Sequence, residues 1–242
     1  VGLATSDYVG NTWSAGANVD VRTTNTVAAG SAANALRFAT AGGLVVNLAG
    51  DASLASGGIL VTPAVGAVVS SINGGTLTSG ANEFIVTQAN TSGTFALNSV
   101  LADGAAAASL TKAGAGTLLL NGTNTFTGGV TVAAGTLAIL ADANLGAVPA
   151  TARTNLTLDG GALSAAVNVA LDAKRGVALA ADSSVAVAAN ATLSLNGAVS
   201  GQGGLTKSGI GTLVLAGVGS ATGATRVAAG TLALGHADAL AA

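Results

Sequence analysis

One stretch of this sequence occurs twice, and the two copies align without a gap. Residues 110–147 and 205–242 are offset by 95 positions, and about half of the aligned residues are identical. The segment Val-Ala-Ala-Gly-Thr-Leu-Ala stands at 132–138 in the first copy and at 227–233 in the second. Such internal repeats are typical of arrays in which each unit packs mainly on its neighbours, so they constrain the fold more than any other feature.

A shorter period runs inside the long one. A Gly-Thr-Leu motif, or a variant of it, recurs about every 19 residues, a spacing typical of one coil of a solenoid. Between these marks, short runs alternate apolar and polar residues, and clusters of Gly, Asn and Ser bound them. That pattern predicts short strands separated by tight corners. The apolar residues of the marks are Leu44, Leu60, Leu77, Phe95, Leu118, Leu137, Leu163, Leu179, Leu193, Leu213 and Leu232.

The two periods predict an all-β fold, a right-handed parallel β-helix with about 19 residues per coil. One coil cannot bury its inward Leu and Val residues alone, whereas coils stacked about 4.8 Å apart build a continuous apolar column. We expect residues 1–37, where repetition is weakest, to form N-terminal starting or capping rungs, and residues 38–242 to form the β-helix, with repeat units at 110–147 and 205–242. The inward side chains are expected to include Leu118, Leu120, Val132, Leu137, Leu213, Leu215, Val227 and Leu232.

The composition agrees with this fold and excludes several other classes. Charged residues make up 7% of the chain and aromatic residues 2%, and there are 36 glycines. This glycine density and the period of two argue against helices, and the abundance of Val, Leu and Thr argues against disorder. A net charge of -2 provides no basic surface for nucleic acid. No apolar run approaches the roughly 18 residues of a membrane-spanning helix, so we expect neither a nucleic-acid partner nor a transmembrane segment.

The aligned copies resemble the autotransporter-associated β-strand repeat, whose pattern runs approximately Leu-Thr-Lys-x-Gly-x-Gly-Thr-Leu-x-Leu-x-Gly-x-Asn-x-Tyr/Phe-x-Gly-Gly-Thr-x-Val-x-x-Gly-Thr-Leu. The second copy departs from it at Gly219, Ala221 and Ala224, where the Asn, the aromatic residue and one Gly are lost. The resemblance implies a β-helical protein that is secreted by a bacterium or displayed on its outer membrane, and it implies no particular activity. The matching positions of the first copy are Leu110, Thr111, Lys112, Gly114, Gly116, Thr117, Leu118, Leu120, Gly122, Asn124, Phe126, Gly128, Gly129, Val132, Gly135, Thr136 and Leu137.

The acidic residues are few and scattered, and no two are adjacent. Glycoside hydrolysis requires two carboxylates about 5 to 9.5 Å apart, and a calcium site requires several oxygen ligands around one ion. Asp142 and Asp159 lie about one coil apart, and Asp159 could stack with Asp172 or Asp182, but solvated corner positions are the simpler interpretation. The acids are Asp7, Asp20, Asp51, Glu83, Asp103, Asp142, Asp159, Asp172, Asp182 and Asp238.

The basic residues and the single histidine also favour structural interpretations. His236 is expected at an exposed corner, because no Cys or second His is present to complete a metal site with it. Lys112 and Lys207 occupy equivalent positions, which predicts a fixed structural place beside the first corner of each unit. The adjacent pair 174–175 could form a small basic patch with Arg153. We therefore predict no catalytic residue, no cofactor-binding residue and no metal site.

These observations favour a non-enzymatic extracellular structural or adhesive surface protein. The chain is expected to be a segment of a longer fibre or a subunit of a head-to-tail filament, because a β-helix with open ends exposes unpaired strand groups. Its expected partners are further coils of the same polypeptide or copies of itself, with surface glycans and other cells as candidates. The alternative is a carbohydrate-active β-helix enzyme, a polysaccharide lyase or hydrolase. A flat threonine face that binds ice or mineral ranks last, because the Thr125-x-Thr127 pair does not recur in each coil.

Overall fold

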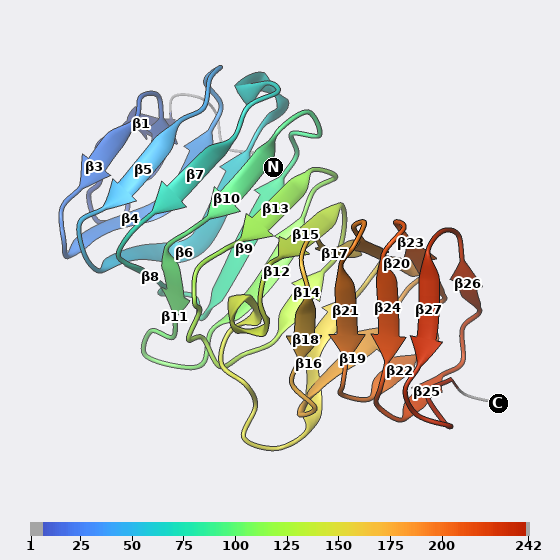
Figure 1. Cartoon of the computed structure of the whole chain (residues 1–242). Helices are drawn as coiled ribbons and strands as arrows, with labels where there is room; N and C mark the ends of the chain where they lie inside the picture. Colours follow the sequence, from blue (N-terminus) through green and yellow to red (C-terminus); the bar gives the residue numbers. More distant parts are fainter. Residues whose placement is uncertain (1–6, 241–242) are drawn as a thin grey trace.

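The computed structural model describes residues 7–240, and these residues form a parallel β-solenoid (Figure 1). They contain 27 short strands and the short 3-10 helices η2 (Pro63–Val65) and η3 (Asp142–Leu145), and every strand pairing in this range is parallel. The predicted parallel β-helix class is confirmed, and the right-handed sense of the coil stays a prediction. No helix in this part of the chain is long and apolar enough to cross a membrane.

The strands form three sheets, named A, B and C here. Sheet A contains β1 (Tyr8–Gly10), β2 (Asn18–Val21), β4 (Ser31–Phe38), β6 (Ala52–Val61), β8 (Thr76–Ser79), β9 (Glu83–Gln88), β11 (Val100–Ala102), β12 (Ser109–Ala113), β14 (Val130–Val132), β16 (Arg153–Leu158), β19 (Arg175–Leu179), β22 (Val199–Gly201) and β25 (Gly219–Ala221). Sheet B contains β3 (Asn25–Val27), β5 (Val45–Leu48), β7 (Ser70–Asn73), β10 (Thr94–Leu97), β13 (Thr117–Leu120), β15 (Thr136–Ile139), β17 (Ala162–Ala165), β20 (Ser183–Val187), β23 (Leu205–Ser208) and β26 (Thr225–Val227). Sheet C contains β18 (Val169–Leu171), β21 (Thr192–Leu195), β24 (Thr212–Leu215) and β27 (Thr231–Leu234).

Most turns of the solenoid have three sides, because the chain passes from sheet A to sheet B and then along a third side. In the N-terminal half, β8 and β11 form part of this third side and remain joined to sheet A through the long, bent strand β6. Residues 124–126 and then the 3-10 helix η3 (Asp142–Leu145) continue the third side through backbone hydrogen bonds, before sheet C takes it over at β18. A second 3-10 helix, η2 (Pro63–Val65), lies at an earlier corner.

The turn is longer than the period of the sequence marks predicts. Nine successive register steps carry sheet A from Val19 on β2 to Ala221 on β25, which is an average of about 22 residues per turn. The predicted turn length of about 19 residues is wrong because the recurring Gly-Thr-Leu motifs do not all lie on the same side of the solenoid. Phe95, Leu118 and Leu137 stack in sheet B, whereas Leu179 lies in sheet A. Leu193, Leu213 and Leu232 lie in sheet C.

The two repeat copies lie on different sides of the solenoid. Leu110 and Leu118 of the first copy lie in sheets A and B, whereas the equivalent Leu205 and Leu213 lie in sheets B and C. The offset of 95 positions is therefore not a whole number of turns but leaves the second copy one side further around the coil. The same strand-corner-strand sequence is thus compatible with either pair of neighbouring sides.

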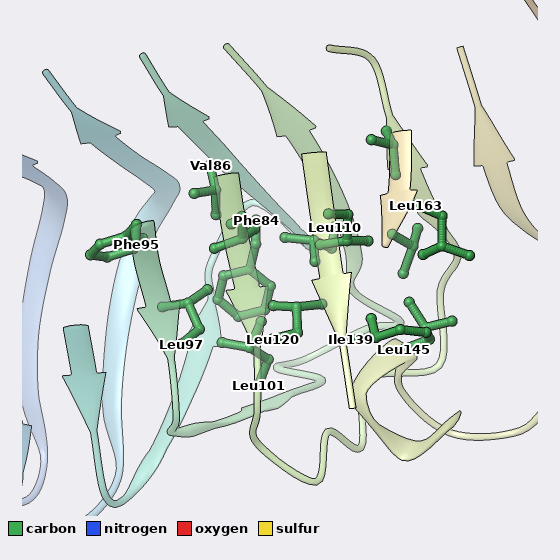
Figure 2. Close-up of a cluster of buried hydrophobic side chains, with 14 of the residues drawn as sticks. Phe84, Val86, Phe95, Leu97, Leu101, Leu110, Leu120, Ile139, Leu145 and Leu163 are labelled. Carbon is green, nitrogen blue, oxygen red and sulfur yellow. The ribbon is translucent and has the colours of Figure 1, made fainter. Parts of the chain in front are cut away.

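The core is a continuous column of apolar side chains enclosed by the three sides. Figure 2 shows part of it, including Phe84, Phe95 and Leu145 from three different sides. Phe95 also meets Phe38 edge to face, with ring centroids 4.9 Å apart, an arrangement that aromatic quadrupoles favour. The predicted inward residues that are fully buried are Leu118, Leu120, Val132, Leu137, Leu213 and Leu215.

Two predicted core residues differ from this pattern. Val227 is 48% exposed, so its predicted burial is wrong, and Leu232 is only partly buried against the core. The reason is that β26 and β27 are the last strands of sheets B and C among the described residues, and so have a neighbouring strand on one side only.

Glycine determines the corners within each repeat. Gly114 and Gly135 have φ of 76° and 64°, in the left-handed region that other residues rarely adopt. The equivalent Gly209 and Gly230 have φ of 72° and 71°. A Cβ on Gly114 would lie 2.5 Å from the carbonyl oxygen of Gln88 on the preceding turn. Substitution at these corners would therefore strain both the backbone and the stacking of adjacent turns.

The first strands pair in the same sheets as the rest of the solenoid. β1, β2 and β4 extend sheet A, and β3 extends sheet B, so the described part of the predicted capping segment is itself β-structured. Residues 1–6 of that segment, and the last two residues of the second repeat unit, lie outside the described residues.

Candidate functional site

The equivalent lysines of the two repeats are fully buried, and backbone carbonyls enclose their ammonium groups. Lys112 occupies an inward position on β12, and its Nζ donates hydrogen bonds to the carbonyl oxygens of Ala113 (2.9 Å), Gly114 (2.6 Å) and Ala134 (2.9 Å). Because an ammonium group has three N–H donors, this cage uses its full hydrogen-bonding capacity. Burial lowers the pKa of Lys112 to about 8, so the group is still mainly charged at neutral pH.

Lys207 repeats this geometry one side further around the coil. Its Nζ donates to the carbonyl oxygens of Ser208 (2.7 Å), Gly209 (2.7 Å) and Ala229 (3.2 Å), and burial lowers its pKa. Each lysine joins the corner after its own strand to the corner one turn later. The predicted structural place of Lys112 and Lys207 beside the first corner of each unit is confirmed.

A further buried cation, Arg175, joins neighbouring turns. It lies near the point where sheet C replaces η3 on the third side of the solenoid. Arg175, fully buried on β19, makes a two-pronged ion pair with Asp142, with Nε–Oδ1 and Nη2–Oδ2 distances of 2.9 and 3.2 Å. Its guanidinium also donates to the carbonyl oxygens of Leu145 and Gly146, both at 3.0 Å, and to Oδ1 of Asn155. All of these partners lie on earlier turns, so Arg175 fastens η3 and β16 to β19.

The charged residues near the N-terminal end form a cluster on sheet A. The buried carboxylate of Asp20 accepts hydrogen bonds from Nε of Arg37 (3.0 Å) and Nε of Arg22 (3.1 Å), and Arg37 lies 3.8 Å from the centre of the Tyr8 ring. Burial acts to raise the pKa of Asp20, but the two arginines outweigh it and lower the pKa. The hydrogen bond to Asp20 raises the pKa of Arg37. These groups therefore stabilise one another.

Comparison with known proteins identifies the repeated unit. Residues 110–139 and 205–234 match the passenger-associated transport repeat, so each match contains one lysine cage. The chain contains two passenger-associated transport repeats. It is also similar to an adhesin, the BmaC autotransporter of Brucella suis biovar 1 (strain 1330), with 42% identity over 124 residues. That alignment covers 50% of this chain and 4% of the adhesin, so the chain spans a small part of that relative. No solved structure matches the chain.

Asp142 and Asp159, the first of the candidate carboxylate pairs, do not stack on one another. Asp142 follows a strand of sheet B and Asp159 follows a strand of sheet A, so the two occupy different corners. Asp142 binds Arg175 and accepts a hydrogen bond from the backbone of Asp172 (3.1 Å). Asp182 accepts one from the backbone of Gly204. Among residues 7–240, no group of three or more His, Cys, Asp or Glu is placed to hold a metal ion.

The histidine and the basic residues do not form one site either. His236, just after the second transport repeat, is exposed, and its Nδ1 accepts a hydrogen bond from the backbone of Asp238 (3.0 Å). The suggested basic patch is wrong in one of the adjacent pair, because Arg175 is buried. Lys174 and Arg153 are exposed and adjacent, joined by a backbone hydrogen bond of 3.1 Å.

Two buried contacts were not predicted from the sequence. The burial of Lys112 had a signal, because a period of two from Leu110 places the lysine on the inward face of the strand. The pairing of Asp142 with Arg175 had none, because 33 residues and more than one corner separate them.

Proposed function

We propose that this chain is a non-enzymatic structural and adhesive segment of a secreted bacterial passenger that is displayed at the cell surface. The observation that supports the proposal most strongly is the pair of passenger-associated transport repeats built into one uninterrupted solenoid. The similarity to an adhesin over half of the chain supports the adhesive role. The buried cations Lys112, Lys207 and Arg175 donate their hydrogen bonds to backbone carbonyls and, for Arg175, also to Asp142. This supports a structural scaffold in preference to a catalytic centre.

The adhesive role is tested with the purified chain coated on beads. Beads that carry the folded chain should bind host cells or abiotic surfaces above the level of beads that carry the same chain after thermal unfolding. Equal adhesion by the folded and unfolded chains would contradict the proposal. Electron micrographs should show a rod of roughly 50 Å, the length of about ten turns spaced 4.8 Å apart.

The carbohydrate-active enzyme remains the alternative function, and release of reducing sugar from acidic or neutral glycans would support it. It would need a pair of free carboxylates, and the carboxylate of Asp142 is already bound by Arg175.

We also propose that further turns cover the C-terminal edge of the solenoid. Val227 and Leu234 on the last described turn are 48% and 53% exposed, and β26 and β27 have unpaired edges. Further coils of the same polypeptide would cover them, and a second copy added head to tail would do so by forming an open filament. Analytical ultracentrifugation decides between the two, because only the second arrangement gives species that grow with protein concentration.

A further inference from the structure

A cleft lies on the side of the solenoid where two loops leave the regular coil. The register step of sheet A from Val130 to Leu156 is several residues longer than the steps on either side of it. The additional length lies mainly in residues 146–152, a loop that projects at the bottom of the view in Figure 1. A cavity of about 490 Å³ lies between this loop and the loop before β12. Its lining includes Ala107, Thr127, Val148, Pro149, Ala150 and Arg153.

Hydrogen bonds fix both walls of this cleft. Behind one wall, Asp103 accepts hydrogen bonds from the backbone of Ala108 (2.7 Å) and from the backbone and Oγ1 of the lining residue Thr127 (2.9 and 2.7 Å). Burial acts to raise the pKa of Asp103, but these bonds outweigh it and lower the pKa, so the carboxylate stays ionised. On the other wall, Arg175 binds the carbonyl oxygen of Gly146 at the base of the loop, and Pro149 is buried. The cleft is therefore largely preformed.

Arg153 supplies an unpaired positive charge to the cleft. Its Nη2 donates to the carbonyl oxygen of Thr127 (2.7 Å), and it takes part in none of the ion pairs formed by the described residues. A guanidinium has five N–H donors, so most of the fork remains available. The nearby Asp103 is not part of the cleft lining, and its oxygens are already engaged.

Arg153 also borders a second space further along sheet A. A second cavity of about 160 Å³ shares Arg153 and extends to Thr154, Gly176 and Ser200. From β14 to β22, sheet A advances by three register steps, or about 14 Å. Hydroxyls and small side chains line this path, and the exposed Lys174 lies beside it.

We propose that the groove formed by the cleft and the adjoining second cavity binds an acidic glycan chain. The carboxylate or sulfate of one sugar residue would contact the guanidinium of Arg153. A planar guanidinium matches the geometry of such oxyanions, the threonine and serine hydroxyls suit sugar hydroxyls, and the exposed Val148 offers an apolar contact to a sugar ring. An acidic peptide fits less well, because β16 and β19 are paired on both sides and leave no edge on which a peptide strand could add. This inference rests on the proposed adhesive function and names its ligand class.

The test measures binding of the intact chain to oligogalacturonate, which carries carboxylates, and to heparin oligosaccharides, which carry sulfates. Neutral dextran oligosaccharides and polyglutamate are the comparison ligands. Arg153→Gln should weaken acidic-glycan binding about tenfold or more, because it removes a charge-assisted hydrogen-bonded pair. The matched control Arg226→Gln removes an exposed arginine at the edge of sheet B, far along the coil, and should change affinity less than about twofold. Ala150→Trp keeps the charge but fills the cleft, so it should also abolish binding.

Tighter binding of the carboxylate or of the sulfate ligand would identify the acid and support the proposal in either case. The proposal is overturned if neither acidic glycan binds, if polyglutamate binds as tightly, or if Arg153→Gln and Arg226→Gln have equal effects while circular dichroism shows both folded. Bead adhesion measured in parallel separates the two proposals. Adhesion that persists in Arg153→Gln would leave the adhesive function standing and remove only the glycan groove.

Discussion

Replacing Lys112 with methionine tests whether the lysine cage stabilises the transport repeat. Methionine has a similar length and fills the same inward space, but it cannot donate hydrogen bonds. The substitution therefore removes three donors from the carbonyl oxygens of Ala113, Gly114 and Ala134 without opening a large cavity.

The expected magnitude follows from two opposing terms. Hydrogen bonds that involve a charged group contribute about 1.5–3 kcal/mol each, so the three bonds together contribute roughly 4.5–9 kcal/mol. Against this stands the cost of burying the ammonium of Lys112, which lowers its pKa from 10.5 to about 8 and corresponds to about 3 kcal/mol. The difference predicts that Lys112→Met lowers the free energy of unfolding by about 1.5–6 kcal/mol at neutral pH.

The pH dependence has a definite sign. The pKa of Lys112 is lower in the folded chain than in the unfolded chain, so between about pH 8 and 10.5 the unfolded state binds more protons. Stability due to this group therefore rises as the pH increases through that window. Lys112→Met lacks this contribution, so the difference in unfolding free energy between wild type and variant should widen from pH 7 to pH 10.5.

The assay is urea unfolding followed by circular dichroism at several pH values. Lys174→Met is the matched control, because it makes the same substitution at an exposed lysine and should change stability by less than about 0.5 kcal/mol. A Lys112→Met variant as stable as wild type, or a stability difference that does not change from about pH 7 to 10.5, would contradict the stabilising role of the lysine cage.

Three further substitutions test the core and the ion pairs. Leu118→Asp places a carboxylate in the closed core and should lower the unfolding free energy by more than about 4 kcal/mol. Leu119→Asp, on the outward face of the same strand, should lower it far less. Equal thermal melts of the two variants would contradict the assigned faces. Arg175→Met leaves the partly buried Asp142 unpaired and should cost about 3–5 kcal/mol, with clear non-additivity in a double-mutant cycle with Asp142→Asn. The lowered pKa of Asp20 stabilises the fold above the unfolded pKa near 3.8, and this contribution is lost as the pH falls through the folded value; Asp20→Asn should flatten the acid limb of the stability profile.

The inward faces of the strands could be predicted from the sequence because side chains alternate along a strand. Leu118 and Leu137 are buried as the period of two requires, and the same period places Lys112 inward. The turn length could not be predicted in this way. Register steps in sheet A are unequal, short between Val19 and Leu36 and much longer between Ile59 and Val86, because the corners differ in length.

Local patterns were enough to predict stacked parallel strands with an apolar interior, because alternation and glycine corners act over a few residues. The side that each strand occupies emerged only from the folded chain, which places equivalent halves of the two transport repeats on different sheets. The folded chain also determines the partners of Asp142 and the position of Arg153 beside a cleft. The physical reason is that a strand motif satisfies the same local preferences on any of the three sides, whereas contacts between turns depend on the summed lengths of all intervening corners.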